Sequence, residues 1–213
     1  MVERLRTPQV KQILVDITTR VTQARDELNN MDSACGDGDF GTSMWISFSN
    51  ARKQLDELPI SDMGTMILTL GQAILSSAGG AAGPIFGSFF IEAGKVAKGK
   101  DELDIADLAR MFDASLEKIK RQGGAKVGDK TVVDAIEPAV NALKEDVAGN
   151  TSLAQGLRNA ASAARTGCES TKGLVARHGK ARYLGEQSLG YVDPGAHVIM
   201  IIFETFAKSQ GTD

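Results

Sequence analysis

The chain has 213 residues, a length that favours one domain with a core large enough to fold without disulfides. Its 24 basic and 27 acidic residues give a formal net charge of −3, which excludes the strong basic excess of a general nucleic-acid binder. No signal-peptide-like segment opens the chain, and no apolar run is long enough to span a membrane. The two cysteines favour a reduced, cytoplasmic protein, and a single Cys35–Cys168 disulfide is the alternative.

Apolar residues recur with a helical period along almost the whole chain, and no segment shows a clear period of two. The pattern predicts eight helices, which begin near Thr7, Thr42, Ser61, Pro84, Ile105, Thr131, Ser152 and Asp193. The last one opens with Asp193-Pro194, an N-cap residue followed by proline at the first helical position. Pro138 lies inside the sixth helix, where we expect a kink. The sequence therefore predicts a single all-α domain over residues 1–213.

The connections between these helices are of two kinds. Those after the second, fourth and sixth helices are plain, as in Asp56 to Ile60, whereas those after the odd-numbered helices are rich in glycine. The glycine-rich connections cover residues 32–41, 79–84, 123–130 and 173–195. Short connections favour antiparallel neighbours, so all four of these loops would lie at one end of the domain. We therefore expect the chemistry of this protein on a single rim.

The first glycine-rich loop carries three aspartates, Asp32, Asp37 and Asp39, interleaved with glycines. Carboxylates on a kinked loop are the ligands that a hard cation such as Mg2+ prefers. The pattern is not an EF-hand, because the twelfth position counted from Asp37 is Phe48 instead of glutamate. Ordinary turn and N-cap aspartates are the alternative interpretation.

Two segments match the sequence patterns of familiar nucleotide-binding motifs, but the predicted structure around them does not fit those motifs. The segment 36–41 satisfies G-x-G-x-x-G but follows a predicted helix, and the segment 123–131 resembles a Walker A loop with Asp129 out of place and no strand before it. Each glycine-rich loop instead runs into a helix N-terminus, where free N–H groups favour phosphate. Several such loops beside an acidic loop indicate a Mg-nucleotide site.

The sequence gives little support for catalysis by a nucleophilic side chain. The chain has two histidines, and His197 lies inside a predicted helix, where a packing role is the simpler interpretation. His178 belongs to a basic stretch with Arg177, Lys180 and Arg182, which suits either phosphate or a solvated face.

Five motifs in a fixed order carry a family resemblance over nearly the whole chain. They are the loop from Asp32 to Met44, the segment Gly79 to Gly87, Gly128 to Ala135, Gly179 to Glu186, and Gly190 to Ala196. Together they resemble the nucleotide-binding L subunit, a DAK2-type domain, of dihydroxyacetone kinases. The resemblance implies an eight-helix antiparallel barrel with the nucleotide at its rim.

The resemblance also implies a set of site residues. Asp32, Asp37 and Asp39 would hold two Mg2+ ions that bridge the phosphates of ADP or ATP. The phosphate contacts would be Phe40, Gly41, Thr42, Ser43, Gly80, Ala81 and Ala82. The adenine and ribose pocket would involve Gly123, Val132, Lys180, Asp193, Pro194 and Gly195.

The activity that the resemblance implies is phosphotransfer to dihydroxyacetone. A separate K subunit would hold the sugar through a histidine of its own, so no catalytic residue is expected in this chain. A phosphotransferase-system M subunit would rephosphorylate bound ADP. In the alternative, ATP is an exchangeable substrate of a direct kinase for dihydroxyacetone or another small ketose.

This sequence departs from the family pattern at five positions. Phe40 stands where histidine is usual, Ala82 where serine is usual, Ser43 where asparagine is usual, Lys180 where arginine is usual, and Arg182 where serine is common. The first two changes each remove a polar phosphate contact, while the metal aspartates are intact. A non-catalytic nucleotide-sensing subunit is therefore a further alternative.

Overall fold

Long helices account for most of the residues that the structure, a computed structural model, describes: 4–59 and 62–210. The α-helices are α1 Thr7–Gln23, α2 Arg25–Ser33, α3 Phe40–Glu57, α4 Met63–Ser77, α5 Ala82–Ala97, α6 Ile105–Gly123, α7 Val133–Ala148, α8 Leu153–Ser170 and α9 Pro194–Lys208. Two 3-10 helices, η1 Thr171–Gly173 and η2 Lys180–Ser188, lie between α8 and α9. The all-α prediction is confirmed.

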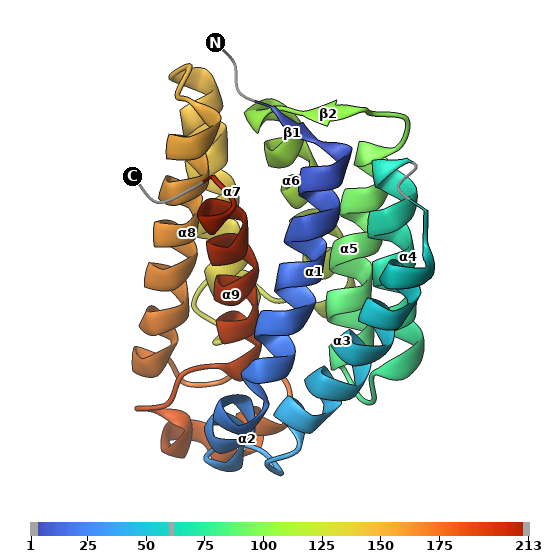
Figure 1. Ribbon diagram of the computed structural model, residues 1–213. Helices are drawn as coiled ribbons and strands as arrows, with labels where there is room; N and C mark the ends of the chain where they lie inside the picture. Colours follow the sequence, from blue (N-terminus) through green and yellow to red (C-terminus); the bar gives the residue numbers. More distant parts are fainter. Residues whose placement is uncertain (1–3, 60–61, 211–213) are drawn as a thin grey trace.

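The eight longer helices, α1 and α3 to α9, follow one another around a ring. Each packs on the next one along the chain, with α1 against α3, and α9 packs back on α1. Figure 1 shows neighbouring helices running in opposite directions, with α2 and the loop before α3 at the lower end. The short antiparallel pair of strands, β1 Leu5–Arg6 and β2 Glu102–Leu103, lies at the opposite end.

Three details differ from the sequence-based expectations. The first predicted helix is broken at Ala24, so that Leu28 belongs to α2. The hydroxyls of Thr18, Thr19 and Thr22 bond to carbonyls one turn earlier, a pattern that weakens and bends helices. The strands β1 and β2 were too short to give a period-2 signal.

The other predicted helices agree closely with the structure in where they begin. Pro138 lies inside α7, which continues through it from Val133 to Ala148, and the kink at this proline stays a prediction. Asp193 caps α9 by accepting the N–H of Ala196 at 2.7 Å. Ile60 and Ser61, which entered the predicted second connection and third helix, lie outside the described residues.

All eight phenylalanines of the chain join one aromatic network inside the ring. It begins at Phe40, at the first residue of α3, whose ring centroid lies 6.4 Å from that of Phe86. It ends at Phe203 and Phe206 on α9, which both contact Phe112. Buried aromatic pairs stabilise a core beyond the area they bury. The first residue of α3 is thereby tied to the centre of the molecule.

Glycines bring α4 and α5 into unusually close contact. A Cβ built on Gly71 would lie 2.7 Å from the backbone nitrogen of Ile91 and 2.8 Å from the carbonyl oxygen of Gly87. Gly64 and Gly94 make a second such approach nearer the other end of the pair. The two helices therefore hold the connection between them, residues 78–81, at a fixed place.

Both cysteines are free and buried, so the disulfide alternative is wrong. Burial raises the pKa of the Cys168 thiol to about 12, which suits a small core residue. Within the described part of the chain, no helix is both long enough and apolar enough to cross a membrane.

We predict that Gly71→Ala lowers the free energy of unfolding by about 1–3 kcal/mol, because the added methyl group overlaps the backbone of α5. Urea unfolding measures the change. Gly79→Ala is the matched control, since a Cβ there meets no atom within 4 Å, and it should shift stability by less than about 0.5 kcal/mol. Equal losses in both variants would contradict the close-packing argument.

Candidate functional site

The four glycine-rich connections meet at one end of the ring, as the antiparallel pattern predicts (Figure 1). A hydrogen bond from Lys180 in η2 reaches the carboxylate of Asp37. On the other side, the side chain of Val132 lies against Gly195 at the start of α9. The ring of Phe40 packs near Phe86, one turn into α5. These contacts link residues that lie far apart in the sequence.

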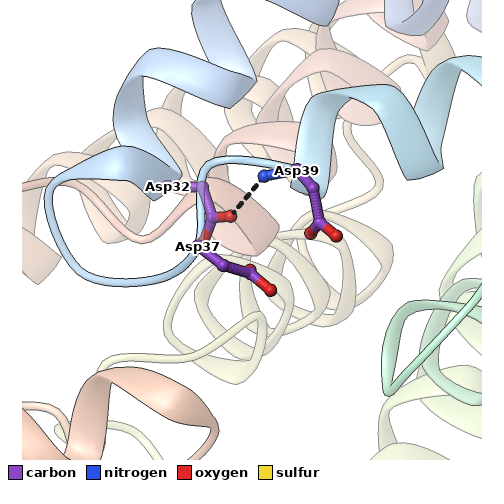
Figure 2. A group of neighbouring side chains, drawn as sticks. All are labelled: Asp32, Asp37 and Asp39. Atoms are coloured by element: carbon purple, nitrogen blue, oxygen red, sulfur yellow. Dashed lines mark hydrogen bonds between the residues drawn. The ribbon is translucent and has the colours of Figure 1, made fainter.

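Asp32, Asp37 and Asp39 converge at this rim (Figure 2). Asp32 lies in the last turn of α2, Asp37 in the loop that follows it, and Asp39 at the N-cap of α3. One oxygen from each lies within 4.8 Å of the others. Asp37 and Asp39 are exposed and Asp32 is half-buried. Three convergent carboxylate oxygens open to solvent form a cluster that a divalent cation can bridge.

The loop holds its shape through hydrogen bonds to the start of α3. One oxygen of Asp32 accepts the N–H groups of Asp39 and Phe40 at 3.1 and 3.2 Å. Asn29 accepts the N–H of Thr42 at 3.0 Å and donates to its hydroxyl at 3.1 Å. Gly38 sits at φ 75°, a left-handed conformation that favours glycine. The second oxygen of Asp32 remains for a ligand.

Lys180 is the cation that faces this cluster. Its hydrogen bond is the largest influence on Asp37, and it lowers the pKa of that carboxyl group. The same bond raises the pKa of Lys180, with further support from Asp39 and Asp32. The site therefore pairs the ionised carboxylate of Asp37 with an exposed ammonium group.

The N-terminus of α5 lies at the same rim and is a candidate for binding an anion. Gly80 adopts φ 61°, and Ala81, the N-cap residue, provides no side-chain hydrogen bond to the helix. No atom lies within 4 Å of a Cβ built on Gly80, so the backbone there is open to a ligand. Free N–H groups at such a terminus suit phosphate. Ala82 is buried and belongs to the hydrophobic core.

The remaining predicted contacts divide into two groups. Val132, Asp193, Pro194 and Gly195 come together, with Val132 buried against the first turn of α9. Burial raises the pKa of Asp193 to about 7, although the N–H of Ala196 acts in the opposite direction. Gly123 ends α6, and no atom lies within 4 Å of a Cβ built on it.

The structure gives a part in shaping the site to two residues to which the sequence analysis assigned no role, although Asp134 lies in the motif from Gly128 to Ala135. One is Asn29, which fixes the first turn of α3. The other is Asp134, which accepts the N–H of Gly128 at 2.6 Å and of Thr131 at 2.7 Å and so shapes the loop before α7. The spacing of Asp134, three residues after Thr131, is a signal that could have identified it.

Both histidines have acidic neighbours. His178 lies 3.3 Å from a carboxylate oxygen of Asp129, which also faces Arg177 at 3.7 Å. The basic stretch is therefore partly paired within the protein. His197 lies 3.4 Å from Glu27 and packs between α9 and α2, consistent with a structural role.

A groove of about 510 Å3 lies between α7 and α8 and is lined by Asp134, Pro138, Asn159, Thr166 and others. It contains none of the residues predicted to contact a nucleotide or a metal.

The sequence matches the DAK2 domain family over residues 34–208. It is 36% identical over 180 residues to the ADP-binding subunit DhaL of the PEP-dependent dihydroxyacetone kinase of Escherichia coli, covering 84% of this chain and 86% of that protein. It is 37% identical to the L-erythrulose 1-kinase of Mycolicibacterium smegmatis over 80% of this chain and 30% of that enzyme.

The fold also resembles a solved structure. The crystal structure of the dihydroxyacetone kinase from C. freundii in complex with AMP-PNP and Mg2+ superposes with a TM-score of 0.74 at 26% identity. The match covers 98% of this chain and 35% of that one. The similarity therefore extends over one part of a longer enzyme.

We predict that Asp37→Asn weakens the binding of a divalent cation at least about tenfold, equivalent to about 1.4 kcal/mol, because it removes one of three converging charges. Titration with Mn2+, followed by electron paramagnetic resonance, measures the affinity. Asp101→Asn is the control, because Asp101 is exposed beside β2 at the opposite end. Unchanged Mn2+ affinity in Asp37→Asn would remove this residue from the metal site.

Proposed function

The chain belongs to the DAK2 domain family, and on that premise we propose that it is the ADP-binding subunit of a dihydroxyacetone kinase. It carries a phosphoryl group on a bound nucleotide and presents it to dihydroxyacetone held by a separate K subunit. The observation that carries this proposal is the cluster of Asp32, Asp37 and Asp39 at the start of α3. We further propose that residues 1–213 act as one domain of this family.

The carboxylate cluster fits Mg2+ by the chemistry of its donors. Three hard oxygen ligands lie within 4.8 Å of one another, and the rest of the coordination shell faces solvent, where water and phosphate oxygens complete it. Asp32, Asp37 and Asp39 would hold the metal, with two ions as in the pattern that the family resemblance implies. Bound Mg2+ neutralises phosphate charge during phosphoryl transfer.

The other residues of the rim position the nucleotide. The first turns of α3 and α5 offer backbone N–H groups from Phe40 to Ser43 and from Gly80 to Ala82 for the phosphates. Lys180 provides a positive charge beside them. Phosphoryl transfer depends mainly on positioning and charge neutralisation, so this chain needs no nucleophile of its own.

On the base side, Val132, Asp193, Pro194 and Gly195 form a surface for adenine and ribose, and Gly123 would complete it from the end of α6. Val132 is the apolar part of this surface. The hydrogen bond from Ala196 to Asp193 holds the turn in place. The proposed contacts thus extend from the metal loop across to the start of α9.

The phosphate donor follows from the relatives. The E. coli protein is the ADP-binding subunit of a PEP-dependent kinase. We therefore propose that ADP remains bound as a coenzyme and is rephosphorylated by a phosphotransferase-system M subunit. Direct use of ATP on dihydroxyacetone or another small ketose is the alternative, which the similarity to an L-erythrulose kinase supports.

Phe40 and Ala82 support a second candidate function, a non-catalytic nucleotide sensor. Phe40 packs toward Phe86 and Ala82 lies in the core, so neither side chain offers a polar group to phosphate. Each lost neutral hydrogen bond is worth about 0.5–1.5 kcal/mol. Backbone N–H groups at both helix starts remain to bind the phosphates.

We predict that the chain, mixed with a K subunit and dihydroxyacetone, forms dihydroxyacetone phosphate when phosphotransferase-system proteins and phosphoenolpyruvate are supplied. A coupled assay that reduces the product with NADH measures the rate. The control is the same mixture with Asp37→Asn, which should be inactive. Absence of product with every donor, ATP included, would support the sensor instead.

We also predict that the purified protein retains ADP, because a coenzyme that is rephosphorylated in place has no need to dissociate. Acid denaturation followed by anion-exchange chromatography measures the nucleotide released, with one ADP per chain expected. A protein that is empty as purified, and that binds Mg-ATP reversibly, would contradict the coenzyme proposal and favour direct use of ATP.

A further inference from the structure

Lys130 occupies an unusual place in the loop before α7. Its backbone adopts φ 61°, a left-handed conformation that is strained for a residue with a side chain. Among the described residues, the one other non-glycine residue with positive φ is Asn150, whose type tolerates that region. Glycine would fit position 130 without strain. The position therefore holds lysine for what its side chain does.

The side chain of Lys130 is also unusual in its burial. It is the one lysine or arginine in the buried part of the described chain, with 4% of its surface exposed. Burial lowers the pKa of Lys130, and the nearby carboxylates of Asp193 and Asp134 act in the opposite direction. A buried ammonium group is costly unless it is hydrogen-bonded and paired with opposite charge. The groups that bond to the Lys130 ammonium group therefore decide whether it can remain buried.

Those partners are the two ends of one segment. The ammonium nitrogen donates to the carbonyl oxygen of Thr171 at 2.7 Å and to that of Tyr191 at 2.5 Å. We refer to residues 171–193, which include η1 and η2, as the strap. Two more hydrogen bonds close the same ends: the N–H of Asp193 donates to the hydroxyl of Thr171, and that of Gly190 to the carbonyl of Lys172. The two ends of the strap therefore lie close together.

The loop that carries Lys130, before α7, is itself held by hydrogen bonds. Asp134, in the first turn of α7, accepts N–H groups from Gly128 and Thr131 on either side of Lys130. Asp129, the preceding residue, adds a contact to the strap, because its carbonyl accepts the N–H of Arg177 at 3.1 Å. The strap is thus anchored to α7 through a short, well-bonded loop.

The far part of the strap carries Lys180, which donates to Asp37 of the metal loop. Just before it, Arg177 and His178 contact Asp129, the neighbour of Lys130 in the loop before α7. The N–H of Ala176 donates to the hydroxyl of Ser188 within the strap itself, and Tyr183 is 78% exposed. The position of Lys180 therefore depends on how firmly the ends of the strap and the loop that carries Lys130 hold it.

We propose that Lys130 is a positioning residue, which ties the two ends of the strap together and so sets Lys180 over the carboxylate cluster. The inference rests on the proposed function for its consequence, since Lys180 then faces the nucleotide phosphates. Lys130 itself is buried below the strap and acts through Lys180. Its loss loosens the strap and leaves the helical ring in place.

Hydrogen exchange of the nucleotide-free protein, followed by mass spectrometry, tests the first step. In Lys130→Met, peptides from residues 174–192 should exchange at least about tenfold faster, while peptides from α1 and α5 keep their rates. Lys11→Met is the matched control, because Lys11 also donates to a backbone carbonyl, that of Leu58, at the opposite end. Strap peptides that exchange at the wild-type rate in Lys130→Met overturn the proposal.

A double-mutant cycle tests the second step. Lys180→Met should raise the Kd for Mg-ADP about tenfold in the wild-type background and less than about twofold in Lys130→Met. Equal effects in the two backgrounds overturn the proposal. If Lys130→Met does not fold, Lys130→Gly replaces it in both measurements, since glycine accepts the positive φ. A wild-type protein that binds no nucleotide would refute the proposed function. The role of Lys130 in holding the strap would then still be decided by the hydrogen-exchange experiment, which needs no nucleotide.

Discussion

Mutual repulsion among three carboxylates is the constraint around which the rim is organised. With oxygens within 4.8 Å of one another, the like charges repel, which costs stability. Two features offset part of this cost: the N–H groups at the start of α3 bind Asp32, and Lys180 binds Asp37. Three carboxylates still face one lysine, and a bound divalent cation would relieve the remaining repulsion.

Packing elsewhere in the fold keeps the three carboxylates close together despite their repulsion. The loop runs into α3, whose first residue, Phe40, begins the aromatic network that crosses the interior to α9. Glycine contacts between α4 and α5 fix the turn that joins these two helices. Because the helices alternate in direction, every glycine-rich connection opens on the same rim, and the described residues at the opposite end form plain turns and the β1–β2 pair.

Much of this arrangement could be predicted from the sequence. The predictions succeeded for features that a local sequence pattern determines. The spacing of the three aspartates among glycines identified the carboxylate cluster, and Asp193-Pro194 identified the start of α9 within one residue. Alternation of plain and glycine-rich connections identified the common rim. In each case residues close in the sequence decide the outcome.

The sequence did not reveal features that depend on contacts between distant segments. The hydrogen bond between Lys180 and Asp37 joins residues 143 positions apart, and no local pattern encodes it. The break at Ala24 lies inside an apolar stripe that continues into α2, so periodicity alone conceals it. The 3-10 helices between α8 and α9 lie in a glycine-rich segment without helical period, where tertiary hydrogen bonds fix the backbone.

Binding of the metal and the nucleotide together at the carboxylate cluster can be tested by a crystal structure with ADP and Mn2+, measured at the manganese absorption edge. We expect anomalous peaks between Asp32, Asp37 and Asp39, with phosphate oxygens in contact and the adenine toward Val132 and Gly195. Nucleotide bound away from this rim, or bound here with no metal between the three aspartates, would contradict it.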